Sequence, residues 1–162
     1  MKENDSLKVI IDYHNINDYL HNIPPYLFVD GAEVIPGKSA IGYKNTSINE
    51  WYFSCHFPGD PIMPGVFQLE TIMETASLCI FTLEGHKNIK LYVNELTKVK
   101  VLRAVRPGDR LEIQAEIKSF RRGVALAQGM VSANGVKTCE AEFTLISPEI
   151  IAKYQVRKKD DA

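Results

Sequence analysis

Residues 56–70 read HFPGDPIMPGVFQLE, and this stretch decides how the rest of the chain is interpreted. It begins with a histidine, passes through a loop with three prolines and two glycines, and then enters an apolar segment. Each proline fixes φ and removes a backbone donor, so the loop has little conformational freedom. A stiff loop holds a side chain in place, and His56 carries an imidazole, the group suited to proton transfer near neutral pH.

The segment after the loop predicts a helix over residues 65–83, with Gly85 as its C-terminal stop. Its polar side chains fall on two narrow stripes separated by apolar residues: Gln68, Thr71 and Thr75 on one, Glu70, Glu74 and Ser77 on the other. A surface helix shows a single polar face, so we expect this helix to be surrounded by protein. A carboxylate there must be paired, protonated or functional, which makes Glu70 a candidate site residue.

The remaining segments have the alternation typical of β-strands. Before the loop we expect a strand or an extended arm over 7–13, a short helix over 16–23 capped by Asn15, and a hairpin of strands 26–34 and 39–46. After the helix we expect strands over 89–93, 99–105, 111–120, 124–132 and 136–146, then a helical tail from Pro148 that ends in the charged RKKDDA. One buried helix with a run of antiparallel strands indicates the α+β class.

The composition is that of an ordinary globular domain. The chain has 162 residues, 45% of them hydrophobic, and a net charge of −1, so we expect one domain over 1–162 with an N-terminal extension (1–20) and a C-terminal tail (148–162). Three distant cysteines without a CxxC pair indicate neither disulfides nor a zinc site. The polar N-terminus and the lack of a long apolar run predict a cytoplasmic protein without a membrane span.

The stretch 56–70 resembles the active-site segment of the FabZ/FabA-type 3-hydroxyacyl-acyl carrier protein dehydratases. The similarity extends over roughly residues 20–147 and includes PYLFVD (25–30), Gly37-Lys38, Asn49-Glu50 and RPGD (106–109). It is closest to the FabZ pattern. The resemblance implies a hotdog fold, in which a curved antiparallel sheet wraps around a long central helix, and an enzyme that needs no cofactor and no metal.

The resemblance also implies roles for particular residues. His56 corresponds to the base that removes a proton from C2, and Glu70 to the carboxylate that handles the departing hydroxyl and its water. The backbone N–H groups at Gly65 and Val66 correspond to the position that stabilises the thioester oxygen. In this family the histidine of one subunit meets the carboxylate of another, so we expect a homodimer or a trimer of dimers, with an acyl carrier protein as the substrate-bearing partner.

Three positions depart from the family pattern. Glu74 stands where a glutamine is usual; it is a possible second carboxylate that shares a proton with Glu70, or else a solvated side chain at the edge of the site. Cys55 replaces a small glycine before the histidine. Asp60 is closer to the FabA form, so an additional isomerase activity stays open, as do the acyl chain length and the choice between fatty-acid and polyene or polyketide synthesis.

Residues 98–122 form a basic stretch, with eight positive and three negative side chains and hence a local charge of +5. Such a stretch can steer an acidic carrier protein, although exposed strands also carry charges of this kind. The candidate docking residues are Lys98, Lys100, Arg103, Arg106, Arg121 and Arg122. No stacking aromatic motif accompanies them, so nucleic acid is not the expected partner. The alternative functions are a hotdog acyl-thioesterase and a non-catalytic acyl-binding or heterodimer partner subunit.

Overall fold

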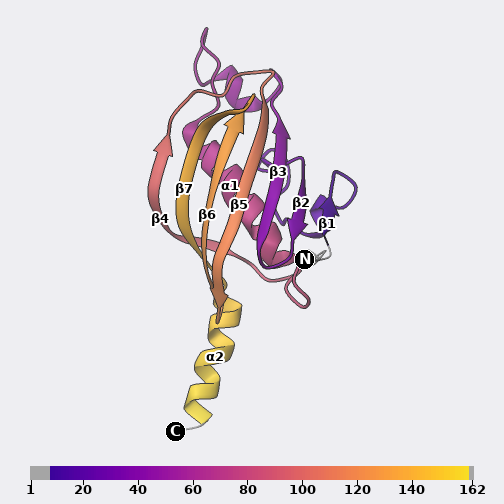
Figure 1. The fold of residues 1–162 in the computed structure, drawn as a ribbon, viewed down its shortest axis with the longest axis vertical. Helices are drawn as coiled ribbons and strands as arrows, with labels where there is room; N and C mark the ends of the chain where they lie inside the picture. Colours follow the sequence, from indigo (N-terminus) through magenta and orange to yellow (C-terminus); the bar gives the residue numbers. More distant parts are fainter. Residues whose placement is uncertain (1–7, 161–162) are drawn as a thin grey trace, which may run out of the picture.

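A seven-stranded antiparallel sheet curves around one long helix in the computed structural model, which describes residues 8–160 (Figure 1). The strands are β1 (Val9–Ile11), β2 (Gly31–Ile35), β3 (Ser39–Asn45), β4 (Tyr92–Val101), β5 (Arg110–Arg121), β6 (Val124–Ala133) and β7 (Val136–Ile146). Their order across the sheet is β1-β2-β3-β5-β6-β7-β4. The predicted curved sheet around a helix is therefore confirmed. Residues 1–7 of the predicted extension and 161–162 of the tail lie outside the described residues.

The central strands separate the two faces of the sheet cleanly. In β5, side chains from Leu111 to Ile117 alternate between buried and exposed, so every second residue points toward the helix. Glu112 and Glu116 lie on the outer face of this strand. The apolar alternation that predicted this strand thus places its apolar side chains in the core.

The long helix, α1 (Gly65–Phe81), is enclosed by the sheet and by the segments before β2. Thirteen of its seventeen residues are buried, including the polar Gln68, Thr71 and Glu74. The prediction that this helix is surrounded by protein is confirmed. The helix ends two residues earlier than predicted, at Phe81, where the Thr82 hydroxyl donates to the carbonyl of Leu78 at 2.8 Å.

Two predicted strands, 89–93 and 99–105, are a single strand in the structure. The pairing of β4 with β7 shifts register between Val93 and Glu95 and again between Thr97 and Lys100. Each irregularity breaks the two-residue alternation of side chains. The apolar alternation in the sequence is therefore interrupted, although the strand itself continues. All ten residues of β4 are exposed, because this strand forms one edge of the sheet.

The segments before the active-site loop are less regular than predicted. The strand expected over 26–34 begins only at Gly31, because the N–H of Phe28 donates to a side chain of α1 and not to a neighbouring strand. The short helix expected over 16–23 is limited to the 3-10 turn η1 (Ile16–Asp18). Asn15 does not cap this turn, since its side chain bonds backbone groups of the preceding residues 10 and 12.

Two further helical segments flank this body. The 3-10 helix η2 (Trp51–Ser54) leads into the loop that carries His56. The C-terminal helix α2 (Pro148–Asp160) begins at the predicted Pro148, continues into the charged end of the tail and projects away from the sheet (Figure 1). Within residues 8–160, no helix is both long and apolar enough to cross a bilayer.

Candidate active site

His56 lies half-buried in the loop between η2 and α1. Its ring nitrogen Nδ1 is 3.0 Å from the carbonyl oxygen of Ile62. The ring of Phe57 stacks against it, with the ring centres 3.9 Å apart, and the peptide bond between these two residues is cis. A carbonyl oxygen only accepts hydrogen bonds, so Nδ1 carries the proton and Nε2 keeps its lone pair.

The loop is fastened to the segment that follows β4. The N–H of Met63 donates to the carbonyl of Val105 at 2.8 Å. Nη1 of Arg106 lies 2.6 Å from Oδ1 of Asp60. These contacts join the HFPGDP loop to the Arg106-Pro107-Gly108-Asp109 turn, and they fix the position of the histidine relative to the end of β4.

A buried ion cluster supports the chain just before this loop. The ammonium of Lys44, on β3, is 2.8 Å from a carboxylate oxygen of Glu50 and 3.3 Å from one of Asp30. Lys44 is only 6% exposed, and the two carboxylates compensate the loss of water around its charge. Glu50 is the residue that precedes η2, and the cluster therefore ties the entry of the loop to the sheet.

Gly65 begins α1 directly behind the loop. Pro64 at the helix N-cap makes no side-chain capping bond, and the N–H groups of the first turn have no acceptors within a helix. The N–H groups of Gly65 and Val66 therefore project outward from the N-terminal end of the helix. The positive end of the helix dipole lies at the same place. A Cβ on Gly65 would lie 3.0 Å from a γ-carbon of Val101, which explains why this position is a glycine.

Glu70 and Glu74 lie one turn apart on α1 and share a hydrogen-bond donor. Nδ2 of Asn22 is 2.7 Å from Oε1 of Glu74 and 3.4 Å from Oε1 of Glu70. The other oxygen of Glu74, Oε2, accepts the backbone N–H of Phe28 at 2.8 Å. Glu74 is 3% exposed, so the expectation of a solvated side chain at the edge of the site is wrong.

Burial dominates the electrostatics of this pair. It raises the pKa of Glu70, against the opposing effect of the Asn22 hydrogen bond. It raises the pKa of Glu74 to about 8, although the Phe28 and Asn22 donors stabilise the ionised form. The negative charge of a neighbouring carboxylate acts in the same direction as burial. The two groups can therefore keep a proton between them at neutral pH.

A cavity of about 210 Å³ opens beside the two carboxyl groups. Its walls come from α1, from residues 20–22 and from the beginning of β4, where Tyr92 and Val93 lie. Met73 and Leu145 give it an apolar floor. Among the described residues, those that line it do not include His56. One subunit thus brings Glu70 and Glu74 together at a cavity that its own His56 does not line.

Sequence reasoning missed Asn22 and Phe28, which complete the carboxyl pair. Asn22 precedes the Pro24-Pro25 pair in an irregular segment, and Phe28 contributes only its backbone N–H. A backbone donor leaves no signal in the sequence, and an asparagine before a proline turn is ordinary loop composition. The spacing of Glu70 and Glu74 was the signal for the carboxyls themselves.

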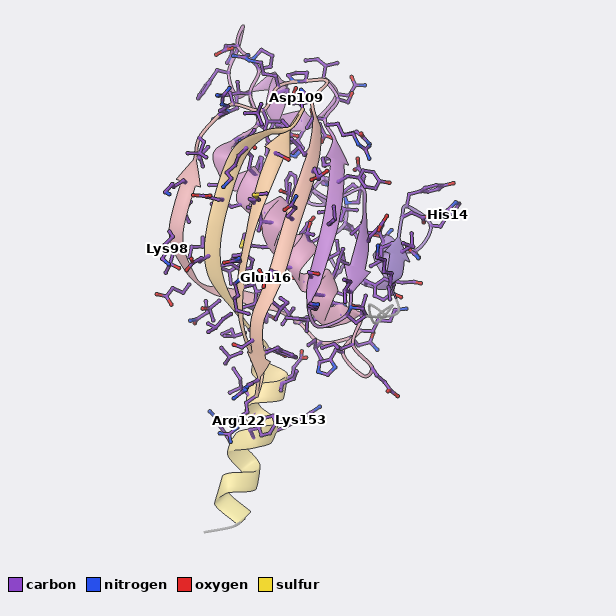
Figure 2. All side chains as sticks on the ribbon, in the orientation of Figure 1. His14, Lys98, Asp109, Glu116, Arg122 and Lys153 are labelled. Carbon is purple, nitrogen blue, oxygen red and sulfur yellow. The ribbon has the colours of Figure 1, made fainter. Side chains whose placement is uncertain are left out.

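The six candidate docking residues are distributed over both ends of the sheet. Lys98 and Lys100 pair with Glu142 and Glu140 on β7. Arg106 is paired with Asp60 before β5, whereas Arg121 is the last residue of that twelve-residue strand and Arg122 follows it. Figure 2 shows Lys98 beside the sheet edge and Arg122 at the base of α2. These residues, with Arg103, do not form one cluster, and their docking role stays a prediction.

Comparison with known proteins places the chain in a family. A family model described as a FabA-like domain matches residues 25–142. The FabZ 3-hydroxyacyl-[acyl-carrier-protein] dehydratase of Clostridium acetobutylicum is 39% identical over 123 residues, which are 75% of this chain and 87% of that protein. The FabZ dehydratase of Latilactobacillus sakei is 36% identical over 138 residues, 85% of this chain and 99% of that protein. The chain belongs to the FabA-like family, in which these relatives are FabZ dehydratases.

Solved structures share the fold at low sequence identity. A chain of the dehydratase heterocomplex ApeI:P from Xenorhabdus doucetiae superposes with a TM-score of 0.71 at 14% identity, over 82% of this chain and 90% of that one. A hypothetical thioesterase with coenzyme A from Streptococcus pneumoniae gives a TM-score of 0.54 at 15% identity, over 69% and 80%. These likenesses confirm the predicted hotdog fold.

Proposed function

We propose that this chain dehydrates (3R)-3-hydroxyacyl thioesters carried by an acyl carrier protein to trans-2-enoyl thioesters. The observation that carries the proposal is the position of Glu70, a half-buried carboxyl beside a cavity, whose pKa burial raises. A carboxyl that keeps its proton is what a departing hydroxyl requires. The family supports the substrate class, since its FabZ relatives are named for this reaction.

Three groups of the protein take part in the reaction: His56, Glu70 and the backbone N–H groups at the start of α1. Nε2 of His56 takes the proton from C2, and the electron pair of that C–H bond becomes available for the new double bond. The C2–C3 double bond forms as the C3–oxygen bond breaks, and Glu70 gives its proton to the leaving hydroxyl, which departs as water. The protein is left with a protonated His56 and an ionised Glu70, and proton exchange with solvent restores both.

The N–H at the start of α1 supports the charge that develops on the thioester oxygen. When C2 loses its proton, negative charge moves onto that oxygen. The N–H of Gly65, with that of Val66, is a donor without an acceptor within the helix. The tautomer of His56 suits this arrangement, because the Ile62 carbonyl holds the Nδ1 proton and leaves Nε2 available as a base.

The active site requires a second copy of the chain. The edge strand β4 pairs with β7 on one side only, and apolar side chains lie exposed along it and just after it: Tyr92, Val93, Leu96, Val99, Val101 and Leu102. An exposed apolar strand edge is a template for pairing with another chain. Antiparallel pairing of β4 with its copy about a two-fold axis gives a closed homodimer.

This pairing brings His56 of one subunit toward Glu70 of the other. The Val101 end of β4 lies against Gly65 and leads to the anchor of the His56 loop, whereas its Tyr92 end lines the Glu70 cavity. In a two-fold antiparallel pair, the Val101 end of each strand lies beside the Tyr92 end of the other. The His56 loop of the partner then approaches the Glu70 cavity of this chain, and each dimer holds two such sites.

The test is an assay on 3-hydroxyacyl thioesters of several chain lengths, attached to a carrier protein, with formation of the conjugated enoyl thioester as the readout. We expect His56→Ala and Glu70→Gln each to lower kcat by about 10²-fold or more. The matched controls His14→Ala and Glu33→Gln change exposed residues outside the site and keep wild-type rates. Release of free thiol without enoyl product identifies a thioesterase, and full activity of His56→Ala removes the proposed base.

A further inference from the structure

An asparagine side chain connects the two carboxyl groups of the site. Nδ2 of Asn22 is the nitrogen that lies 2.7 Å from Glu74 and 3.4 Å from Glu70. A side-chain amide nitrogen carries two hydrogens, so one group can donate to both carboxyls at once. Asn22 comes from the irregular segment before β2, opposite α1, and bridges the two elements across the cavity wall.

Glu74 is fixed more firmly than Glu70. Glu74 is almost fully buried, and each of its oxygens accepts one N–H, from Phe28 and from Asn22. Glu70 is half-buried and accepts only the longer bond from Asn22. Hydrogen bonds from two donors favour the ionised form of the group that accepts them. Burial outweighs these donors and raises the pKa of Glu74 to about 8, so Glu74 is the fixed, buried member of the pair, while Glu70 lines the cavity as the less constrained one.

We propose that Asn22 is a positioning residue, which uses Glu74 as its anchor to hold the carboxyl group of Glu70 toward the substrate cavity. The inference rests on the proposed function, because it assigns Glu70 the role of acid. It goes beyond that function in two respects. It gives Glu74 a role as the buried anchor of the pair, and it gives Asn22 a role that neither the motif nor the spacing of the carboxyls indicated.

Other groups also act on the pair and enter any dependence on pH. The titratable or charged groups that face the two carboxyls are His21 and Tyr26 before β2, Lys44 on β3, and Lys90 and Tyr92 around the start of β4. None of these is changed in the variants below. Differences between the variants therefore report on Asn22 and Glu74.

The experiment compares the dependence of kcat on pH for wild type, Asn22→Ala, Glu74→Gln and the control Asn17→Ala. Loss of rate at high pH reports the ionisation of the acid in the enzyme–substrate complex. Asn22→Ala removes donors that stabilise the carboxylates, so we expect kcat to fall about tenfold and the alkaline limb to move up by about half a pH unit. Glu74→Gln removes a neighbour that becomes negative as pH rises, so its limb moves down by a similar amount.

Asn17 is the matched control, because its side chain is exposed in η1 and the same substitution there leaves the site untouched. Asn22→Leu serves as the second variant, since it keeps the volume of the side chain without its donors and reproduces the alkaline shift. A readout independent of activity is the ¹³C titration of the labelled glutamate carboxyl carbons. Asn22→Ala and Asn22→Leu should raise the pH midpoints of both Glu70 and Glu74 in the absence of substrate.

The outcomes separate the two proposals. If wild type produces no enoyl thioester, or if Glu70→Gln keeps full activity, the proposed function fails. If those two behave as expected but Asn22→Ala and Asn22→Leu match Asn17→Ala in rate, alkaline limb and carboxyl titration, the positioning role of Asn22 is refuted. Shifts of the limb in the same direction for Asn22→Ala and Glu74→Gln would also refute it.

Discussion

Gly65 and Val101 approach so closely that a Cβ on the glycine would lie 3.0 Å and 3.2 Å from the two γ-carbons of the valine. The contact sets the N-terminus of α1 against the end of β4. Because both γ-carbons are involved and a β-branched side chain has few rotamers, a methyl group on residue 65 requires Val101 or the helix N-terminus to shift.

Gly65→Ala should therefore displace the helix N-terminus that carries the proposed oxyanion donors. We expect a loss of about 1–2 kcal/mol in the free energy of unfolding and a fall of about tenfold or more in kcat. The double variant Gly65→Ala/Val101→Ala restores space for the methyl group and should recover part of both losses. Wild-type stability and rate in the single variant would contradict this reading of the contact.

Arg106 should matter for catalysis more than for stability. Its ion pair with Asp60 is exposed, with side-chain exposures of 54% and 63%, so it contributes at most about 1 kcal/mol to folding. It nevertheless fastens the His56 loop to the turn before β5. We expect Arg106→Ala to lower kcat about tenfold with little change in melting temperature. Lys118→Ala, which removes an exposed pair on the outer sheet face, is the control; equal rates in both variants would argue against a positioning role of the pair.

The buried carboxyl of Glu74 should make stability fall as pH rises. Burial raises its pKa from 4.5 to about 8, so the folded protein holds this proton more tightly than the unfolded chain. The corresponding stability is complete below the unfolded pKa and is lost as pH rises through the folded one. Urea unfolding at about pH 5 and about pH 8 should show the wild type losing at least about 1 kcal/mol relative to Glu74→Gln. Parallel pH dependences of the two proteins would contradict the prediction.

A charge on the β4 edge should separate the subunits. Leu96 lies near the middle of β4 and is 43% exposed in one subunit. We expect Leu96→Asp to yield a folded monomer in sedimentation experiments, with enoyl formation reduced about 10²-fold or more, because each site then lacks one of its two groups. Val136→Asp, at the exposed start of β7, should remain dimeric and active. A dimeric, fully active Leu96→Asp would exclude β4 as the interface.

Much of the fold could be predicted because its signals are local. The apolar alternation of β5, β6 and β7 and their Arg122-Gly123 and Asn134-Gly135 turns follow directly from residue type. The two polar stripes of α1 indicated a helix enclosed by protein. The register shifts of β4 could not be predicted, because a bulge is set by the pairing with β7 and leaves no residue signature of its own.

Part of the site could be predicted because its signals are also local in the sequence. His56, Gly65 and Glu70 belong to one continuous motif, and Glu74 lies one helical turn beyond it. Asn22 reaches Glu70 and Glu74 from 48 and 52 residues away in sequence, and such contacts depend on how the segment before β2 crosses α1. Periodicity and spacing contain no information about that crossing, so the donor of the carboxyl pair emerges only from the structure.

The central claim is that His56 of one subunit works with Glu70 of its partner, and complementation tests it most directly. Co-folding His56→Ala with Glu70→Gln places both defects in one site of each mixed dimer and leaves the other site intact. With random pairing, we predict about a quarter of the wild-type rate of enoyl formation, although each parent alone is inactive. A mixture that stays at the level of the two parents, while mass spectrometry shows mixed dimers, would contradict the shared site.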